Sequence, residues 1–309
     1  MTLDPRDVPV LLIAFNRPEP TREVFEAIRA AAPRNLYLAV DGARPAAGEE
    51  EAAACEQVRA LASSVDWDCT VLTLFQEANL GCRFGVQAAI DWFFSHVEEG
   101  IIFEDDCLPD PTLFGFCAEL LERYRNDPRI MMISGDYFSG TGFNEDHSYF
   151  FTRNTHIWGW ATWRRAWQHF DAQLSAWPRL RESGWLLEVG CGDRDFASFW
   201  TDIFDRVHAG EIDTWDYSWL CSMWQSGALA AQPTCNLVTN IGFGAGATHT
   251  VDTGAWQARL PTEPMEFPLR HPTDVVRDIP RDAWTDRNVF KTRPPTFASR
   301  VAGIVRHLR

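Results

Sequence analysis

The chain has 309 residues, of which 46% are hydrophobic and 23% are charged, enough to bury the core of one large α/β domain or of two small ones. The 28 basic and 43 acidic residues give a net charge of −15. Because a nucleic-acid binder needs a basic surface, this balance excludes general nucleic-acid binding. It allows an anionic substrate, since a bound divalent metal ion reverses the local field.

Several features bear on the cellular compartment. Met1 to Pro9 is polar and lacks the apolar core of a signal peptide, and no run of about 18 apolar residues occurs. The eight Cys form no CxxC pair, so a zinc site of that type is not expected. We expect the protein to work in a reducing cytoplasm, where thiols stay reduced. The basic segment from Arg287 to Arg309 predicts an ordinary surface helix or peripheral contact with the anionic inner face of a membrane.

Strand and helix patterns alternate through the first half of the chain. Apolar runs of strand length are Val8–Ala14, Leu36–Val40, Cys69–Phe75, Ile101–Phe103 and Ile130–Ser134. Helical patterns between them cover Pro20–Ala31, an Ala- and Glu-rich stretch ending near Ala62, Arg83–Val97 and Pro111–Tyr124. This alternation predicts an α/β fold with a doubly wound, parallel sheet and helices on both faces.

The second half has a different composition. Residues 137–170 are rich in aromatics, and Trp158–Trp163 contains three of the 14 Trp, which predicts either a Trp-rich core or a surface on which sugars stack. Helices fit Asp193–Ala209 and Thr214–Gln225, and Ala228–Thr239 is expected to be extended. We predict a division into residues 1–136, 137–250 and 251–309, with one continuous domain as the alternative.

Polar residues follow the predicted strands. Asn16, Arg17, Asp41 and the triplet Glu104–Asp106 all come directly after apolar runs. Because ligands bind outside the carboxyl ends of the strands in such sheets, we expect these residues to share one edge.

The triplet Glu104–Asp106 closes a buried strand. Three adjacent carboxylates repel one another and need a cation or strong hydrogen bonds. Mg²⁺ and Mn²⁺ take carboxylate oxygens together with substrate phosphates, so the triplet indicates a metal–diphosphate site. The alternative is a solvated acidic turn, with Asp110 capping the next helix.

The strand ending in Glu104–Asp106 resembles the DxD motif of GT-A-fold glycosyltransferases, in the form found in inverting N-acetylglucosaminyltransferases of the complex N-glycan type and related bacterial transferases. Val10–Pro18 resembles their first strand and nucleotide-contacting loop, which includes Asn16. Asp41-Gly42 resembles their base- or ribose-binding acid, and Asn79–Gly81 with Arg83 resembles the loop behind the nucleotide. The resemblance covers about residues 8–135 and implies one Rossmann-like mixed sheet, a nucleotide-diphosphate sugar donor, expected to be a UDP-sugar, and a Mn²⁺ or Mg²⁺ cofactor.

The resemblance also implies roles for single residues. Asp106 would bind the metal directly, while Glu104 and Asp105 would contact the nucleoside or support the site. Arg17 and Arg83 would face the phosphates or the base, with ordinary surface charges as the alternative.

Asp216 stands among aromatic residues in Thr214–Trp219, and a partly dry carboxylate gains basicity. The resemblance places the base of an inverting transferase here, where it would take the proton of the acceptor hydroxyl. Asp213 is the rival, and helix capping is the alternative for both. His249, after a Gly-rich turn, would complete the metal shell or touch the diphosphate, unless it is a surface residue. The implied acceptor is a glycan, a lipid-linked molecule or a small molecule.

Other classes of protein stay open at this stage. Leu187–Asp193 resembles the cofactor loop of S-adenosylmethionine-dependent methyltransferases, after a short apolar stretch at Trp185–Val189. A glycoside hydrolase would need two carboxylates on opposite sides of a bond, which adjacent Asp105 and Asp106 do not provide. A carbohydrate-binding module without catalysis would explain the Trp content but not the acidic triplet. No GxGxxG follows the first strand, which argues against a dinucleotide enzyme.

Overall fold

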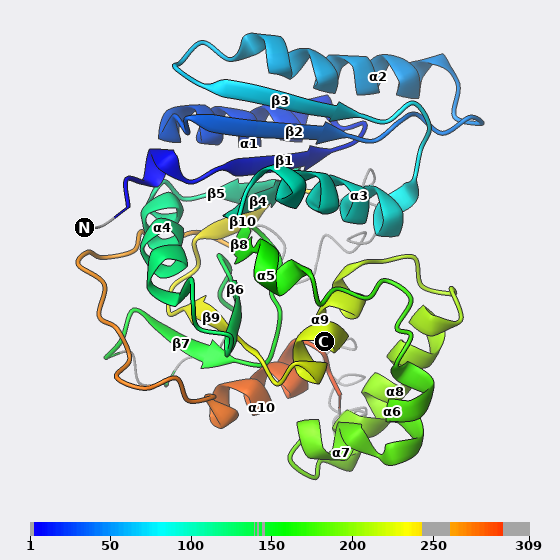
Figure 1. Ribbon diagram of the computed structural model, residues 1–309, viewed down its shortest axis with the longest axis vertical. Coiled ribbons are helices and arrows are strands. Elements are labelled where there is room, and N and C mark those ends of the chain that lie inside the picture. The colour runs from blue at the N-terminus through cyan, green and yellow to red at the C-terminus, as the bar shows by residue number, and fades with distance from the viewer. Residues whose placement is uncertain (1–2, 139, 141, 144–145, 243–259, 293–309) are drawn as a thin grey trace, which may run out of the picture.

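The computed structural model describes residues 3–138, 140, 142–143, 146–242 and 260–292 (Figure 1). Its centre is an eight-stranded mixed sheet in the order β3-β2-β1-β4-β8-β6-β9-β7, which confirms the predicted α/β class. The strands of this sheet are β1 (Val10–Ala14), β2 (Asn35–Val40), β3 (Thr70–Phe75), β4 (Glu99–Glu104), β6 (Ile130–Ile133), β7 (Tyr149–Thr152), β8 (Trp160–Trp163) and β9 (Leu229–Pro233).

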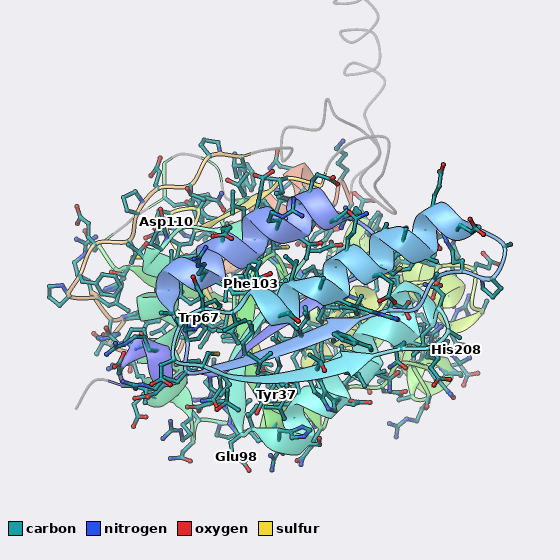
Figure 2. The ribbon with its side chains drawn as sticks, turned by 90° about the horizontal axis from the view of Figure 1, so that it is seen from above. Tyr37, Trp67, Glu98, Phe103, Asp110 and His208 are labelled. Atoms are coloured by element: carbon teal, nitrogen blue, oxygen red, sulfur yellow. The ribbon has the colours of Figure 1, made fainter. Side chains whose placement is uncertain are left out.

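The four strands β3, β2, β1 and β4 are parallel. Every residue of β1 is buried, as expected for a strand covered on both faces. Figure 2 shows two helices on one side of this part of the sheet and a third on the other. These are α1 (Pro18–Ala31) and α2 (Glu49–Arg59), which continues as a 3-10 turn at Ala60–Ser64, and then α3 (Gly81–His96).

The order of the parallel strands creates a switch point. The chain runs outward from β1 to β2 and β3, then crosses back to place β4 on the other side of β1. The loops that follow β1 and β4 therefore leave the sheet in opposite directions and open a crevice between them. The residues after β1 and β4 thus lie where a ligand of this kind of sheet binds.

The second half completes the sheet with antiparallel pairs, so the sheet is mixed rather than parallel throughout. β8 pairs antiparallel with β4, placing Ala161 opposite Ile101. Neither β7 nor β8 was predicted from the sequence. All four residues of each strand are buried, so neither shows the alternation of apolar and polar residues by which a half-buried strand is recognised in a sequence. Pairing with neighbouring strands defines both. A separate antiparallel pair joins β5 (Cys107–Pro109) to β10 (Val238–Asn240), close to the acidic triplet.

The remaining helices are α4 (Thr112–Tyr124), α5 (Arg164–Trp167), α6 (Trp177–Ser183), α7 (Trp185–Val189), α8 (Arg194–His208), α9 (Asp216–Gln225) and α10 (Ile279–Asn288), with a 3-10 turn at Pro5–Asp7. Of these helices, α4 and α5 pack on the main core, whereas α6, α7, α8 and α9 contribute to a second hydrophobic core around Trp200 and Trp224. The sheet includes strands from both sides of residue 136, and the division into 1–136, 137–250 and 251–309 stays a prediction.

Most of the tryptophans belong to the core. Trp160 is fully buried, and its ring stacks on that of Trp215 at 5.6 Å between centroids. The buried set is Trp160, Trp163, Trp167, Trp177, Trp200, Trp215, Trp219 and Trp224. The core interpretation therefore holds for these residues. Across the described ranges, no helix is both long and apolar enough to cross a membrane.

Candidate active site

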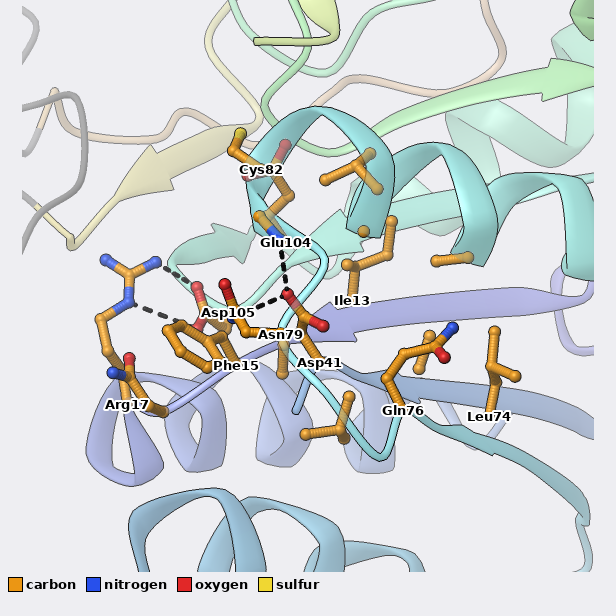
Figure 3. A pocket seen from close by; sticks show the side chains of 18 of the residues that line it. Ile13, Phe15, Arg17, Asp41, Leu74, Gln76, Asn79, Cys82, Glu104 and Asp105 are labelled. Carbon is orange, nitrogen blue, oxygen red and sulfur yellow. Dashed lines mark hydrogen bonds and ion pairs between the residues drawn. The ribbon is translucent and has the colours of Figure 1, made fainter. Parts of the chain in front are cut away.

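A pocket of about 410 Å³ opens at the carboxyl ends of β3, β2, β1 and β4, against the first turns of α3 (Figure 3). Five of the predicted site residues line it, namely Asn16, Arg17, Asp41, Glu104 and Asp105. Its apolar wall comes from the sheet and from α3, through Ile13, Ala39, Val40, Leu74, Val86 and Ala89. The expectation that the strand-end residues share one edge is met, because parallel strands end on the same side.

Arg17 is the cation of the acidic triplet. Its Nη2 donates to Asp106 Oδ2 at 2.8 Å and also bonds to Asp105, while its Nε lies 3.3 Å from Asp105 Oδ2. Burial opposes the charge on Arg17, but the two carboxylates outweigh it and raise its pKa. Burial also disfavours the charge on Asp105 and so raises the pKa of that carboxyl group, while the guanidinium counteracts part of the rise. One side chain from the loop after β1 thus neutralises two from the loop after β4.

Glu104 has no such partner. Its Oε1 is buried and accepts no hydrogen bond among the described residues. Burial, followed by the charges of Asp106 and Asp105, raises the pKa of Glu104 to about 8. The carboxyl group of Glu104 therefore favours either its protonated form or the presence of a cation or hydrogen-bond donor beside it.

Asp41 joins the end of β2 to the start of α3. Its carboxylate accepts the backbone N–H of Leu80 at 2.9 Å and of Gly81 at 3.2 Å, together with the side-chain amide of Asn79 at 2.9 Å. Burial raises the pKa of Asp41, and these N–H groups oppose the rise. A Cβ at Gly85 would come within 3.2 Å of Asp41 Oδ2, so the glycine leaves room for this carboxylate. Asp41 lines the pocket, as predicted, while most of its hydrogen-bonding capacity serves the loop before α3.

Two further predicted residues lie at the edges of the site. Asp106 is buried beneath Arg17, and its Oδ1 accepts a hydrogen bond from Asn240 Nδ2 at 3.3 Å. Arg83 does not line the pocket, because its guanidinium is buried and donates to the carbonyl of Ala172. His249 lies outside the described residues. The triplet is not a solvated acidic turn, because Asp105 and Asp106 are buried, although Asp110 does accept the N–H of Thr112 at 2.9 Å at the start of α4.

Asp216 comes to the same place from the far half of the chain. It opens α9, and its Oδ1 accepts hydrogen bonds from the Thr214 hydroxyl and from the N–H of Tyr217 at 2.9 Å. Its charge contributes to the raised pKa of Glu104, so the two carboxyl groups are near each other. Its rival Asp213 is exposed and lines the pocket directly. The structure thus places Asp213 in the pocket and Asp216 near Glu104, outside the lining residues.

Three residues that line or support the pocket were not predicted from the sequence. Arg44 and Glu51 pair with each other, and Glu51 Oε2 also accepts from Asn16 Nδ2 at 2.9 Å. They belong to a loop and a helix whose pattern gave no chemical signal. Gln76 follows β3 directly, so the rule that selected Asp41 and Glu104 would have found it.

The triplet offers the type of ligand that hard divalent ions prefer. Carboxylate oxygens of Asp105 and Asp106 already hold one cation, the guanidinium, and Glu104 has a buried oxygen without a partner in the described part of the chain. Among the described residues, no group of three or more His, Cys, Asp or Glu side chains is arranged as a metal site. The residues fit an ion that shares one or two carboxylates with substrate phosphates, which is the usual way that Mg²⁺ is held.

In comparisons with known proteins, no family profile and no curated protein sequence matches this chain. One competing interpretation is weakened by the structure itself. Trp185–Val189 forms helix α7, whereas the cofactor loop of a methyltransferase follows a strand. Geometry and chemistry of the pocket are therefore the basis for a functional proposal.

Proposed function

We propose that the protein is a metal-dependent glycosyltransferase that moves a sugar from a nucleotide-diphosphate donor, with UDP as the nucleotide, to a hydroxyl acceptor with inversion. The observation that carries the proposal is the pocket at the switch point. There a guanidinium, two buried carboxylates and a third carboxyl group, one of whose oxygens has no partner among the described residues, lie beside an apolar wall. Charged groups at one end and an apolar wall at the other suit a ligand with a diphosphate and a base.

Arg17 is the residue in this proposal that holds the diphosphate, and Asp41 lies where the ribose would pass. Asp106 would hold Mn²⁺ or Mg²⁺, with His249 as the second ligand that the sequence leads us to expect. When bound, such an ion neutralises the charge that develops on the departing diphosphate. Arg17 supports the same charge from the opposite loop, since its guanidinium offers several donors in one plane.

Asp216 is the proposed base. As the acceptor oxygen attacks the anomeric carbon, its proton passes to Asp216, and the bond from that carbon to the diphosphate oxygen breaks. The electron pair of that bond leaves with the nucleotide diphosphate, which Arg17 faces. A single displacement of this kind inverts the configuration. The Thr214 hydroxyl and the Tyr217 N–H orient the carboxylate for this role.

The acceptor in this proposal is a glycan, a lipid-linked molecule or a small molecule. A cytoplasmic enzyme, with peripheral contact at the inner membrane face through the basic tail, accords with the proposal. Most of that tail lies outside the described residues.

A donor screen tests the proposal. The protein is incubated with MnCl₂ and a panel of nucleotide sugars, and released nucleotide diphosphate is measured, since slow donor hydrolysis needs no acceptor. In parallel, the melting temperature is compared with UDP plus Mn²⁺ and with S-adenosylmethionine. Release from one donor class, together with stabilisation by UDP plus Mn²⁺ alone, supports the proposal. Stabilisation by S-adenosylmethionine alone contradicts it.

A further inference from the structure

Three amide side chains line the pocket, and two of them are already committed to the protein. Asn16 donates to Glu51, and Asn79 donates to Asp41 and to the carbonyl of Gly42 at 3.0 Å. The side-chain amide of Gln76 makes no hydrogen bond within the described part of the chain. It is therefore the amide that has both its donor and its acceptor available to a ligand.

The backbone of Gln76 is held firmly. Its N–H donates to the carbonyl of Val40 at 3.0 Å, and its own carbonyl accepts from Arg59 Nη2 at 2.6 Å. Arg59 in turn lies over the ring of Phe75. The free amide is thus presented from a fixed position at the end of β3, as a group that recognises a ligand should be.

The position of Gln76 along the sheet edge agrees with a nucleotide laid across the strand ends. Figure 3 shows Arg17 and Asp105 at one end of the pocket, Asp41 in the middle and Gln76 beside Leu74 at the other. Three strand spacings separate β4 from β3, about 14 Å in all. If the diphosphate lies at Arg17, the base lies toward β3. There Leu74, Ala39 and Val86 offer an apolar wall for a flat ring.

We propose that Gln76 reads the hydrogen-bonding edge of the donor's base, which the proposed function takes to be uracil. This inference depends on the proposed function, because it assumes a nucleotide diphosphate in the pocket. Uracil presents an N3–H donor beside the O4 acceptor, and the amide of Gln76 offers Oε1 and Nε2 to match them. Asp41, whose carboxylate is largely used by the start of α3, then stands beside the ribose rather than the base.

The test compares nucleotide binding to the full chain and three variants, by calorimetry with UDP or GDP in the presence of MnCl₂. Gln76→Glu replaces one donor by a second acceptor. A carboxylate suits guanine, which has two adjacent donors at N1 and N2, and repels the O4 of uracil. Gln76→Ala removes both groups. Gln57→Glu, on the exposed side of α2, adds the same charge away from the pocket and serves as the control.

We expect the wild type to bind UDP more tightly than GDP. Gln76→Glu should weaken UDP binding by about tenfold or more and shift the UDP-to-GDP ratio toward GDP by a similar factor. Gln76→Ala should weaken UDP by roughly five- to tenfold, and Gln57→Glu should leave both affinities unchanged.

Two results would overturn the inference while leaving intact the proposed transfer from a nucleotide-diphosphate donor, although the first would also replace UDP as its nucleotide. One is a wild type that binds GDP more tightly than UDP, and the other is an unchanged UDP-to-GDP ratio in both Gln76 variants. If the wild type binds neither nucleotide, the proposed function itself fails and the role of Gln76 falls with it.

Discussion

The guanidinium of Arg17, in the loop after β1, bonds to the carboxylates of both Asp105 and Asp106, 88 and 89 residues further along the chain. This contact spans the switch point of the sheet and closes the crevice between the two loops. It also means that the two most buried acids of the triplet are paired within the protein. A divalent ion that binds Asp106 must share this carboxylate with Arg17 or displace the guanidinium from it.

Replacing Arg17 by alanine leaves two adjacent buried carboxylates without their cation. Breaking a buried ion pair by removing one partner costs about 3–5 kcal/mol, and the partial exposure of Arg17 places the expected loss near the lower value. Mn²⁺ should restore more stability to Arg17→Ala than it adds to the wild type. Urea unfolding with and without MnCl₂ measures both effects.

The matched control for this experiment is Arg22→Ala, because Arg22 is an exposed residue of α1, the helix that Arg17 directly precedes. A loss of stability as small as that of the control would show that Arg17 does not hold the triplet. An equal effect of Mn²⁺ on Arg17→Ala and on the wild type would show that ion and guanidinium do not share a site.

Asp216→Asn should lose catalysis while keeping donor binding. Removing a general base costs roughly 100-fold or more in kcat, whereas the donor pocket does not include Asp216 among its lining residues. Turnover by released nucleotide diphosphate and UDP affinity by calorimetry separate the two quantities. Asp213→Asn is the paired variant. If Asp213→Asn loses turnover and Asp216→Asn does not, the base has been assigned to the wrong carboxylate.

Asp136 should make stability depend on pH. It lies just after β6, is buried, and has an Oδ2 without a partner among the described residues. Burial raises its pKa to about 7 from 3.8. Between these values the folded state binds more protons than the unfolded state, so stability falls as the pH rises through this window. The full penalty, roughly 4 kcal/mol, is reached above the folded pKa.

The measurement for Asp136 is the difference in free energy of unfolding between Asp136→Asn and the wild type, at several pH values from 4 to 8. The difference should move in favour of Asp136→Asn as the pH rises. Asp202→Asn, at an exposed position of α8, should show no such trend. A flat difference for Asp136→Asn would mean that its carboxyl group is not perturbed.

Arg153 connects the sheet to the helical part of the chain. Its buried guanidinium pairs with Asp286 of α10 and lies 4.1 Å from the ring centroid of Phe196 in α8. Arg153→Met should therefore cost roughly 3–5 kcal/mol, chiefly by leaving Asp286 buried and unpaired. Adding Asp286→Asn should recover part of the loss, because the unpaired charge is then removed.

Urea unfolding followed by tryptophan fluorescence reports this effect, because Trp224 also lies against Arg153. Arg206→Met, on the exposed side of α8, is the control. If the double variant is no more stable than Arg153→Met, the loss comes from packing of the guanidinium on the rings rather than from the charge of Asp286.

Local patterns in the sequence were enough to predict much of the first half. The sequences of β1, β2, β3 and β4 are visible as short apolar runs, and the helices between them are visible because their apolar residues recur with the helical period. The same patterns place Arg17, Asp41 and Glu104 at strand ends, and parallel strands end on one edge whatever their order. Gln76 obeys the same rule and was overlooked.

The pairing of these residues depends on contacts between segments far apart in the chain. The sequence predicted that Arg17, Asp105 and Asp106 share an edge, but it could not show that one guanidinium bonds to both acids. The approach of Asp216 to Glu104 and the commitment of Asp41 to α3 likewise depend on packing between distant segments. Hydrophobic periodicity is a local property, so the class of fold and the sheet edge at which the strand-end residues meet could be predicted from the sequence. Strand order and side-chain pairing arise from contacts across many tens of residues, and they decided which polar groups are satisfied within the protein and which are left for a ligand.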